Sequence, residues 1–93
     1  MMTELFLDTT VAKQAEVKIV EGDKILCKVV KASPLPAIEE SLKQTGLKLG
    51  EIDRFTAKEG PGSFTGIRVG LSVINSLNFA LGRKVEFKEP KYQ

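Results

Sequence analysis

A glycine-rich segment, EGPGSFTGIRVG at residues 59–70, constrains the fold of this chain more than any other feature of its sequence. It joins an apolar run to a long stretch with helical periodicity, so it predicts a strand-to-helix turn. The glycines around this turn are Gly60, Gly62 and Gly66. Glycine permits positive φ and close approach of another backbone, and Pro61 stiffens the entry to the turn. The loop can therefore bend sharply without strain.

The start of the helix after this turn is a candidate anion site. Ser63 or Thr65 can cap its first turn, and backbone N–H groups at a helix N-terminus attract anions through the helix dipole. Spaced glycines before a helix also serve packing alone, and no Walker-type lysine-serine pair follows them. Both interpretations, packing and anion binding, stay open at this point.

Apolar alternation, turn residues and helix caps predict the element order βββαβαβ. Strands are expected at residues 3–8, 15–20, 24–30, 52–58 and 84–88, and helices at residues 34–45 and 65–81. Gly46 and Gly82 are the expected left-handed helix stops. A hairpin meander followed by right-handed βαβ crossovers gives an α/β fold, a mixed five-stranded sheet with two helices. This is the ribonuclease-H-like topology that each lobe of actin-like ATPases also uses, and residues 1–93 are expected to form one such domain.

The second predicted helix is more apolar than a single sheet contact requires. At about 100° per residue, its apolar side chains and glycines cover an arc of roughly 200°, about twice what packing on a sheet needs. Phe79 stands on the remaining face among Arg68, serines and asparagines. Such excess apolar surface is covered by the chain's own loops or by a protein partner, and we favour the partner.

Composition excludes several classes of function. The chain has no histidine, which removes histidine-based acid/base chemistry, Ser-His triads and His-ligated metal sites. Its 14 basic and 12 acidic residues are scattered, so direct nucleic-acid binding is not indicated. The first twenty residues contain no signal-peptide or membrane-spanning pattern, and the single Cys27 fits a reduced core position. We expect a cytoplasmic protein without membrane contact.

The contiguous string at residues 59–70 closely resembles the GPGSFTGxRxG signature of the TsaB (YeaZ) family. Asp8 and Thr9 resemble the family's N-terminal DT pair, and LPAIEESL at residues 35–42 resembles its LPxIxxxL helix. Residues 80–82 match the end of its second helix. With these residues, the candidate anion site comprises Gly60, Gly62, Ser63, Thr65, Gly66, Asp8 and Thr9.

The resemblance implies a non-catalytic partner subunit in the synthesis of N6-threonylcarbamoyladenosine (t6A) in tRNA. In that pathway a TsaD-type subunit performs the transfer and a TsaE-type ATPase assists, so this chain would meet tRNA only indirectly. No cofactor or metal is expected on the chain itself, with ATP and Mg²⁺ confined to the partner complex. The family is expected to pair through its two helices, with a TsaD-type subunit or, alone, as a homodimer. The implied interface residues are Leu42, Gly66, Gly70, Leu71, Ile74 and Phe79.

The resemblance covers roughly residues 4–87, which correspond to the N-terminal lobe of the family. In two-lobed actin-like folds a nucleotide cleft lies between the lobes, so one lobe supplies half of its walls. Residues 31–33 also replace a basic, histidine-containing segment of the family. The polar, proline-containing stretch at residues 88–93 leads us to expect a naturally short, single-lobe protein.

Other classes of function remain as alternatives. A small ribonuclease-H-like nuclease would need Asp8, Glu39 or Glu40, and Glu59 to converge on Mg²⁺. A phosphate-binding module would use the glycine loop alone. A peptidase is rejected, because neither Cys27 nor Ser63 has an identifiable base.

Overall fold

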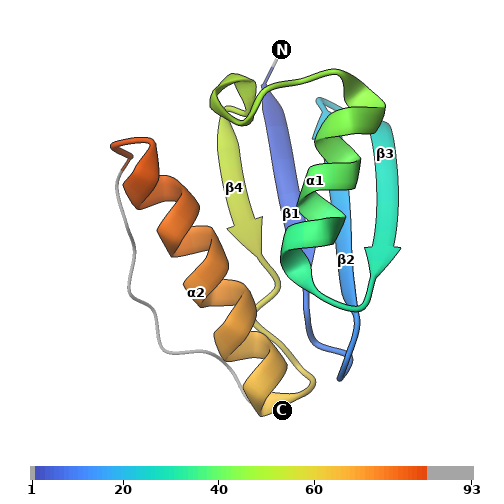
Figure 1. Cartoon of the computed structure of the whole chain (residues 1–93), viewed down its shortest axis with the longest axis vertical. Coiled ribbons are helices and arrows are strands. Elements are labelled where there is room, and N and C mark those ends of the chain that lie inside the picture. The colour runs from blue at the N-terminus through green and yellow to red at the C-terminus, as the bar shows by residue number, and fades with distance from the viewer. Residues whose placement is uncertain (1, 84–93) are drawn as a thin grey trace.

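The computed structural model describes residues 2–83 of the chain (Figure 1). Three strands come first, β1 (Thr3–Asp8), β2 (Ala15–Glu21) and β3 (Lys24–Lys31). Helix α1 (Pro34–Thr45), the short 3-10 helix η1 (Leu49–Glu51), strand β4 (Arg54–Ala57) and helix α2 (Phe64–Ala80) follow in that order. The predicted order βββαβα is confirmed for this part of the chain. The strand predicted at residues 84–88 lies outside the described residues.

The four described strands form one mixed sheet in the order β3-β2-β1-β4. β1 pairs antiparallel with β2 and parallel with β4, and β2 pairs antiparallel with β3, with a bulge between Ile19 and Val20. Both helices lie on the same face of this sheet, α1 over β2 and β3 and α2 beside β1 and β4 (Figure 1). The expected α/β class with a mixed sheet and two helices is therefore confirmed.

The core lies between the sheet and the two helices. Side chains of β1 and β2 alternate between buried and half-buried, as expected for strands with one covered face. The fully buried side chains of these strands include Leu5, Leu7, Val17 and Ile19. They pack with Ile38 of α1 and Ile74 of α2 in one apolar cluster. On the other face the ion pair of Glu16 with Lys28 spans 3.4 Å.

The ends of the elements follow the sequence signals closely, with one exception. Gly46 ends α1 at φ 72°, and Gly82 at φ 70° follows the end of α2, as predicted for left-handed stops. Strand β4 is shorter than the predicted 52–58. The reason is that Ile52 ends η1 with its side chain buried, while the carboxylate of Asp53 accepts a hydrogen bond from the Thr3 N–H at 2.7 Å.

None of the helices in residues 2–83 has the length and apolar character needed to cross a membrane.

Candidate functional site

The candidate site lies where the end of β1 meets the glycine loop and the first turns of α2. The Lys58 N–H donates to the Leu7 carbonyl at 2.9 Å, and the Ser63 N–H donates to the Thr10 carbonyl at 2.7 Å. The Thr9 hydroxyl donates to the Gly66 carbonyl at 2.5 Å. These bonds join segments more than fifty residues apart, so the structure brings Asp8 and Thr9 together with the loop.

The glycines of the site allow the close approach of two backbones. A Cβ atom at Gly66 would overlap the carbonyl group of Thr9, and one at Gly62 would overlap Thr10. At Gly70, one turn later, a Cβ would overlap the Thr9 hydroxyl. Gly62 also has a φ of 152°, a value that other residues rarely adopt. Glycine is therefore required here by contact with Thr9 and Thr10, which directly follow β1.

The first N–H groups of α2 are largely used within the chain. Ser63 is the N-cap, and its hydroxyl accepts a hydrogen bond from the Gly66 N–H at 3.2 Å. The Ile67 N–H donates to the Ser63 carbonyl at 2.9 Å. Thr65 is exposed and Gly60 half-buried beside this turn. The geometry favours packing as the role of the loop, and anion binding at these residues stays a prediction.

Asp8 is the charged group at this junction. Its carboxylate accepts hydrogen bonds from the Thr10 N–H at 2.9 Å and the Thr10 hydroxyl at 2.6 Å, and Lys58 Nζ lies 3.8 Å from its second oxygen. Burial by itself raises the pKa of Asp8, but the Thr10 hydrogen bonds and the nearby lysine charges together hold that pKa below its ordinary value. Asp8 therefore helps to fold the turn after β1 in its ionised form.

Asp8 makes the stability of the fold depend on pH at the acid end. Because its pKa is lower in the folded state, its contribution is complete above the unfolded-state pKa and is lost as pH falls through the folded-state pKa. We expect the stability advantage of the wild type over Asp8→Asn to shrink between pH 7 and pH 3 in urea denaturation. Asp23→Asn, in the exposed β2–β3 turn, is the control. An advantage of constant size at both pH values would contradict this role.

The carboxylates that a metal-dependent nuclease would use do not come together. Glu39 and Glu40 lie on α1, where Glu40 accepts a hydrogen bond from Gln44 at 3.1 Å. Asp8 is instead occupied by Thr10 and Lys58. Within residues 2–83, no group of three histidine, cysteine or acidic side chains is placed to hold a metal ion. The nuclease alternative therefore has no geometric support in this part of the chain.

The residues expected at a partner interface divide between the core and the surface. Ile74 is only 5% exposed, and Gly70 is buried against Thr9, so both face this chain's own sheet. Leu42 is half-buried against the core, and Leu71 lines a hollow between β4 and α2. Phe79, in contrast, is 78% exposed.

The exposed side of α2 carries two large apolar residues that were not among the expected interface residues. Phe64 is 50% exposed and Val69 is 42% exposed. The outer face of α2, as we call this surface, comprises Phe64, Thr65, Arg68, Val69, Ser72, Ser76 and Phe79. A helical wheel started at Phe64 places these seven residues on one side, but the wheel alone does not show which side of the helix faces the sheet. Arg68 supplies the only charge on this face.

Comparison with known proteins relates the chain to a tRNA-modification family. Residues 31–86 match the model of the family described as TsaD: tRNA N6-adenosine threonylcarbamoyltransferase. The tRNA threonylcarbamoyladenosine biosynthesis protein TsaB of Haemophilus influenzae is 47% identical over 45 residues, which is 48% of this chain and 19% of that protein. TsaB of Escherichia coli K12 is 37% identical over 51 residues, 55% of this chain and 21% of that protein.

Solved structures of YeaZ from Pseudomonas aeruginosa have the same fold. One of them is superposed with a TM-score of 0.76 at 30% sequence identity, over 89% of this chain and 41% of the YeaZ chain. A second crystal structure from that organism, of a protein described as similar to peptidase YEAZ, gives the same values. The chain thus spans less than half of the YeaZ structures, and its matches cover about a fifth of the curated relatives.

Proposed function

Since this chain belongs to the TsaB/YeaZ family, we propose that it acts as a non-catalytic partner subunit in the biosynthesis of t6A in tRNA. The observation that carries the proposal is the outer face of α2, which exposes three large apolar side chains within the part of the chain that the family model matches. A subunit of this kind binds a catalytic protein and supports the assembly. It needs no reactive group of its own.

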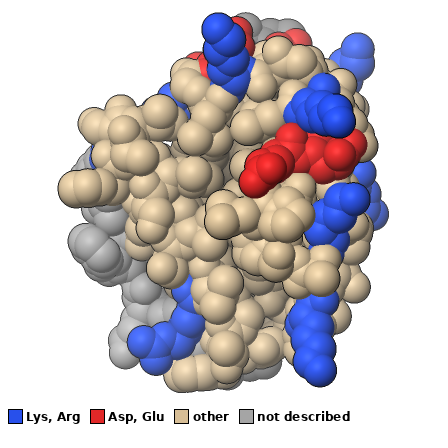
Figure 2. Space-filling model, in the orientation of Figure 1, with Lys and Arg blue, Asp and Glu red and all other residues tan. Residues whose placement is uncertain are grey.

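The outer face of α2 has the composition of a contact surface. Its three large apolar side chains lie at the start, in the second turn and near the end of the helix, with serines and one arginine between them. Phe64, Thr65, Arg68, Val69, Ser72 and Val73 enclose a shallow hollow of about 450 Å³. In Figure 2 the surface over α2 is largely uncharged, whereas lysine and acidic side chains gather over α1. Interface centres are depleted in charge and rich in aromatic residues, which fits this face.

A TsaD-type subunit is the partner that we propose for this face. Residues 31–86 match the family model that is described as TsaD: tRNA N6-adenosine threonylcarbamoyltransferase. A TsaD-type protein therefore carries elements equivalent to α1 and α2, and two such surfaces can pair in a nearly symmetric way. Leu35, in the first turn of α1, is also exposed, at 59%. Pairing of two copies of this chain is the competing arrangement.

The remaining features of the proposal follow from the family. We propose that the chain forms a single ribonuclease-H-like, actin-like lobe with five strands, located in the cytoplasm. ATP and Mg²⁺ would belong to the complex with the TsaD-type subunit and the TsaE-type ATPase. The loop donors of Ser63, Gly66 and Ile67 are already bonded within this chain, which supports placing nucleotide chemistry in the partner.

Substitution of Val69 tests the interface. Val69→Glu places a charge in the outer face of α2, and we expect it to weaken binding to the TsaD-type subunit by at least about tenfold, since burying an unpaired charge is costly. Phe79→Glu should act in the same direction. Val69 is preferred to Leu71, because a glutamate at Leu71 would disturb the hollow beside β4. Binding is measured by calorimetry with purified TsaD-type subunit.

Ile25→Glu is the matched control, because Ile25 is 59% exposed on β3, the edge strand at the opposite side of the sheet from β4 and α2. This variant should bind like the wild type. Light scattering of the chain alone distinguishes the arrangements, since a homodimer broken by Val69→Glu would show self-pairing through the same face. A wild-type chain that stays monomeric and does not bind the TsaD-type subunit would disprove the proposal.

A further inference from the structure

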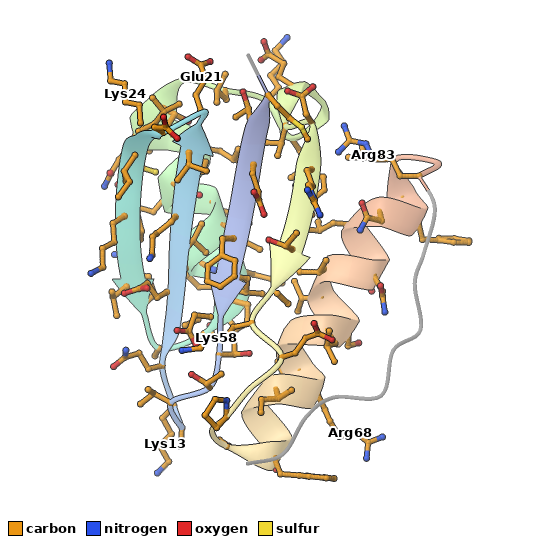
Figure 3. The ribbon with its side chains drawn as sticks, turned by 180° about the vertical axis from the view of Figure 1, so that it is seen from behind. Lys13, Glu21, Lys24, Lys58, Arg68 and Arg83 are labelled. Carbon is orange, nitrogen blue, oxygen red and sulfur yellow. The ribbon has the colours of Figure 1, made fainter. Side chains whose placement is uncertain are left out.

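The outer face of α2 carries a single charged side chain, and an aromatic ring holds it in place. The Arg68 guanidinium lies over the Phe64 ring, with its central carbon 5.5 Å from the ring centre. Arg68 is exposed and projects from α2 away from the sheet (Figure 3). A cation–π contact engages the charge and not a particular N–H group, so the N–H donors of the guanidinium stay available for another acceptor.

No carboxylate in the described part of the chain forms an ion pair with Arg68. The ion pairs there join Glu16 to Lys28 and Asp8 to Lys58. Helix α2 itself contains no aspartate or glutamate. Arg68 also lines the hollow of about 450 Å³ on the outer face of α2. A partner that covers this hollow takes the guanidinium out of water, and a charge buried without a counter-charge opposes binding.

A second copy of this chain is poorly suited to neutralise Arg68. When the same face of two copies pairs, each Arg68 meets an α2 that has no acidic residue. In self-pairing through both helices, the acidic residues available are Glu39 and Glu40 of α1. Glu40 already accepts a hydrogen bond from Gln44 at 3.1 Å. A different protein is not limited in this way, because its own sequence can place a carboxylate opposite Arg68.

We propose that Arg68 selects the partner of this face by forming an ion pair with a carboxylate of the TsaD-type subunit. The inference rests on the proposed function and names the chemistry that its interface requires. Arginine binds a carboxylate through paired, parallel N–H···O hydrogen bonds. Contact with Phe64 before binding reduces the side-chain entropy that is lost in the complex. Phe64, Val69 and Phe79 then supply apolar contact area, and Arg68 discriminates between partners.

Arg68→Met tests this role, because an ion pair and a purely apolar contact predict effects of opposite sign. Methionine keeps an unbranched apolar stem and removes the charge. If a carboxylate lies opposite, the substitution leaves that acid buried without a partner, so binding to the TsaD-type subunit should weaken by at least about 30-fold. If an apolar surface lies opposite, the same substitution removes a desolvated charge and strengthens binding. Calorimetry with purified TsaD-type subunit measures the dissociation constants.

Two further variants complete the series. Arg68→Lys keeps the charge but lacks the planar pair of donors, so its affinity should lie between those of the wild type and Arg68→Met. Lys24→Met is the matched control, since it also removes one exposed positive charge, at the start of β3 and across the sheet from α2 (Figure 3). This control should bind within about twofold of the wild type. Urea unfolding of each variant reports whether it is folded, and for Arg68→Met the midpoint should shift by less than about 0.5 M.

The outcomes separate this inference from the proposed function. Weaker binding of Arg68→Met, with Lys24→Met unaffected, supports both. If Val69→Glu loses binding while Arg68→Met binds as well as the wild type or better, the ion pair is overturned and the proposed interface stands. A wild-type chain that does not bind the TsaD-type subunit overturns both. Light scattering of the chain alone tests the selectivity, because self-association that weakens in Arg68→Met would show that a second copy also supplies a carboxylate.

Discussion

Gly66→Ala is expected to destabilise the fold by about 2–3 kcal/mol, a large part of what a domain of this size has available. The new methyl group would overlap the Thr9 carbonyl, a backbone atom that cannot rotate away. Overpacking of this kind costs about 1–3 kcal/mol or more, and strain on the hydrogen bond from the Thr9 hydroxyl to Gly66 adds to it. Alanine's better helix propensity returns only about 1 kcal/mol. The clash therefore outweighs the gain, and urea denaturation measures the difference.

Gly50→Ala is the control for this substitution. A Cβ atom at Gly50 would meet nothing within 4 Å. The free energy of unfolding of Gly50→Ala should stay within about 0.5 kcal/mol of the wild-type value. If Gly66→Ala proves as stable as Gly50→Ala, the close contact between β1 and α2 is not present in solution.

The effect of Gly70→Ala on the free energy of unfolding is expected to change sign when Thr9 is replaced by alanine. In the wild type the new methyl group would overlap the Thr9 hydroxyl, and we expect a loss of about 1–2 kcal/mol. Thr9→Ala removes that hydroxyl and leaves the Thr9 Cβ at 3.5 Å, an ordinary contact. In that background Gly70→Ala should stabilise the helix by up to about 1 kcal/mol. The coupling energy of the double-mutant cycle is then about 2–3 kcal/mol.

A second double-mutant cycle, with Gly66→Ala and Thr9→Ala, distinguishes contact with the Thr9 side chain from contact with the Thr9 backbone. Thr9→Ala leaves the Thr9 carbonyl in place, so Gly66→Ala should remain destabilising in that background. Additive effects of Thr9→Ala and Gly70→Ala would contradict the contact that the structure shows. Together the two cycles test whether the glycines of α2 serve to pack the helix on β1.

Packing of these glycines on β1 changes the interpretation of the whole segment at residues 59–70. Gly62, Gly66 and Gly70 contact the residues just after β1, and Ser63 caps α2 from within. The glycine-rich string therefore holds α2 at a fixed position against the sheet. With that position set, Phe64, Val69 and Phe79 are exposed on the outer face of α2. In the association that we propose, the loop acts only by orienting the helix.

Local signals in the sequence determined most elements of this fold and the family to which it belongs. Gly46, Gly82 and Ser63 act within one turn of a helix end, where neighbouring residues decide the conformation, so their roles could be predicted. The alternation in β1 and β2 likewise depends on residues two apart. The GPGSFTG string is contiguous, so it could be compared with the family signature without knowledge of the fold.

Only the tertiary structure decided which side of α2 is turned away from the sheet and what the acidic residues do. A helical wheel shows an apolar arc, but the direction in which that arc points depends on where the sheet lies. The contact with Thr9 turned Gly70 and Ile74 inward and left Phe64 and Val69 outside. The candidate metal ligands were likewise separated because α1 packs on β2 and β3, away from Asp8. Both outcomes depend on contacts between residues far apart in the chain, which local periodicity does not contain.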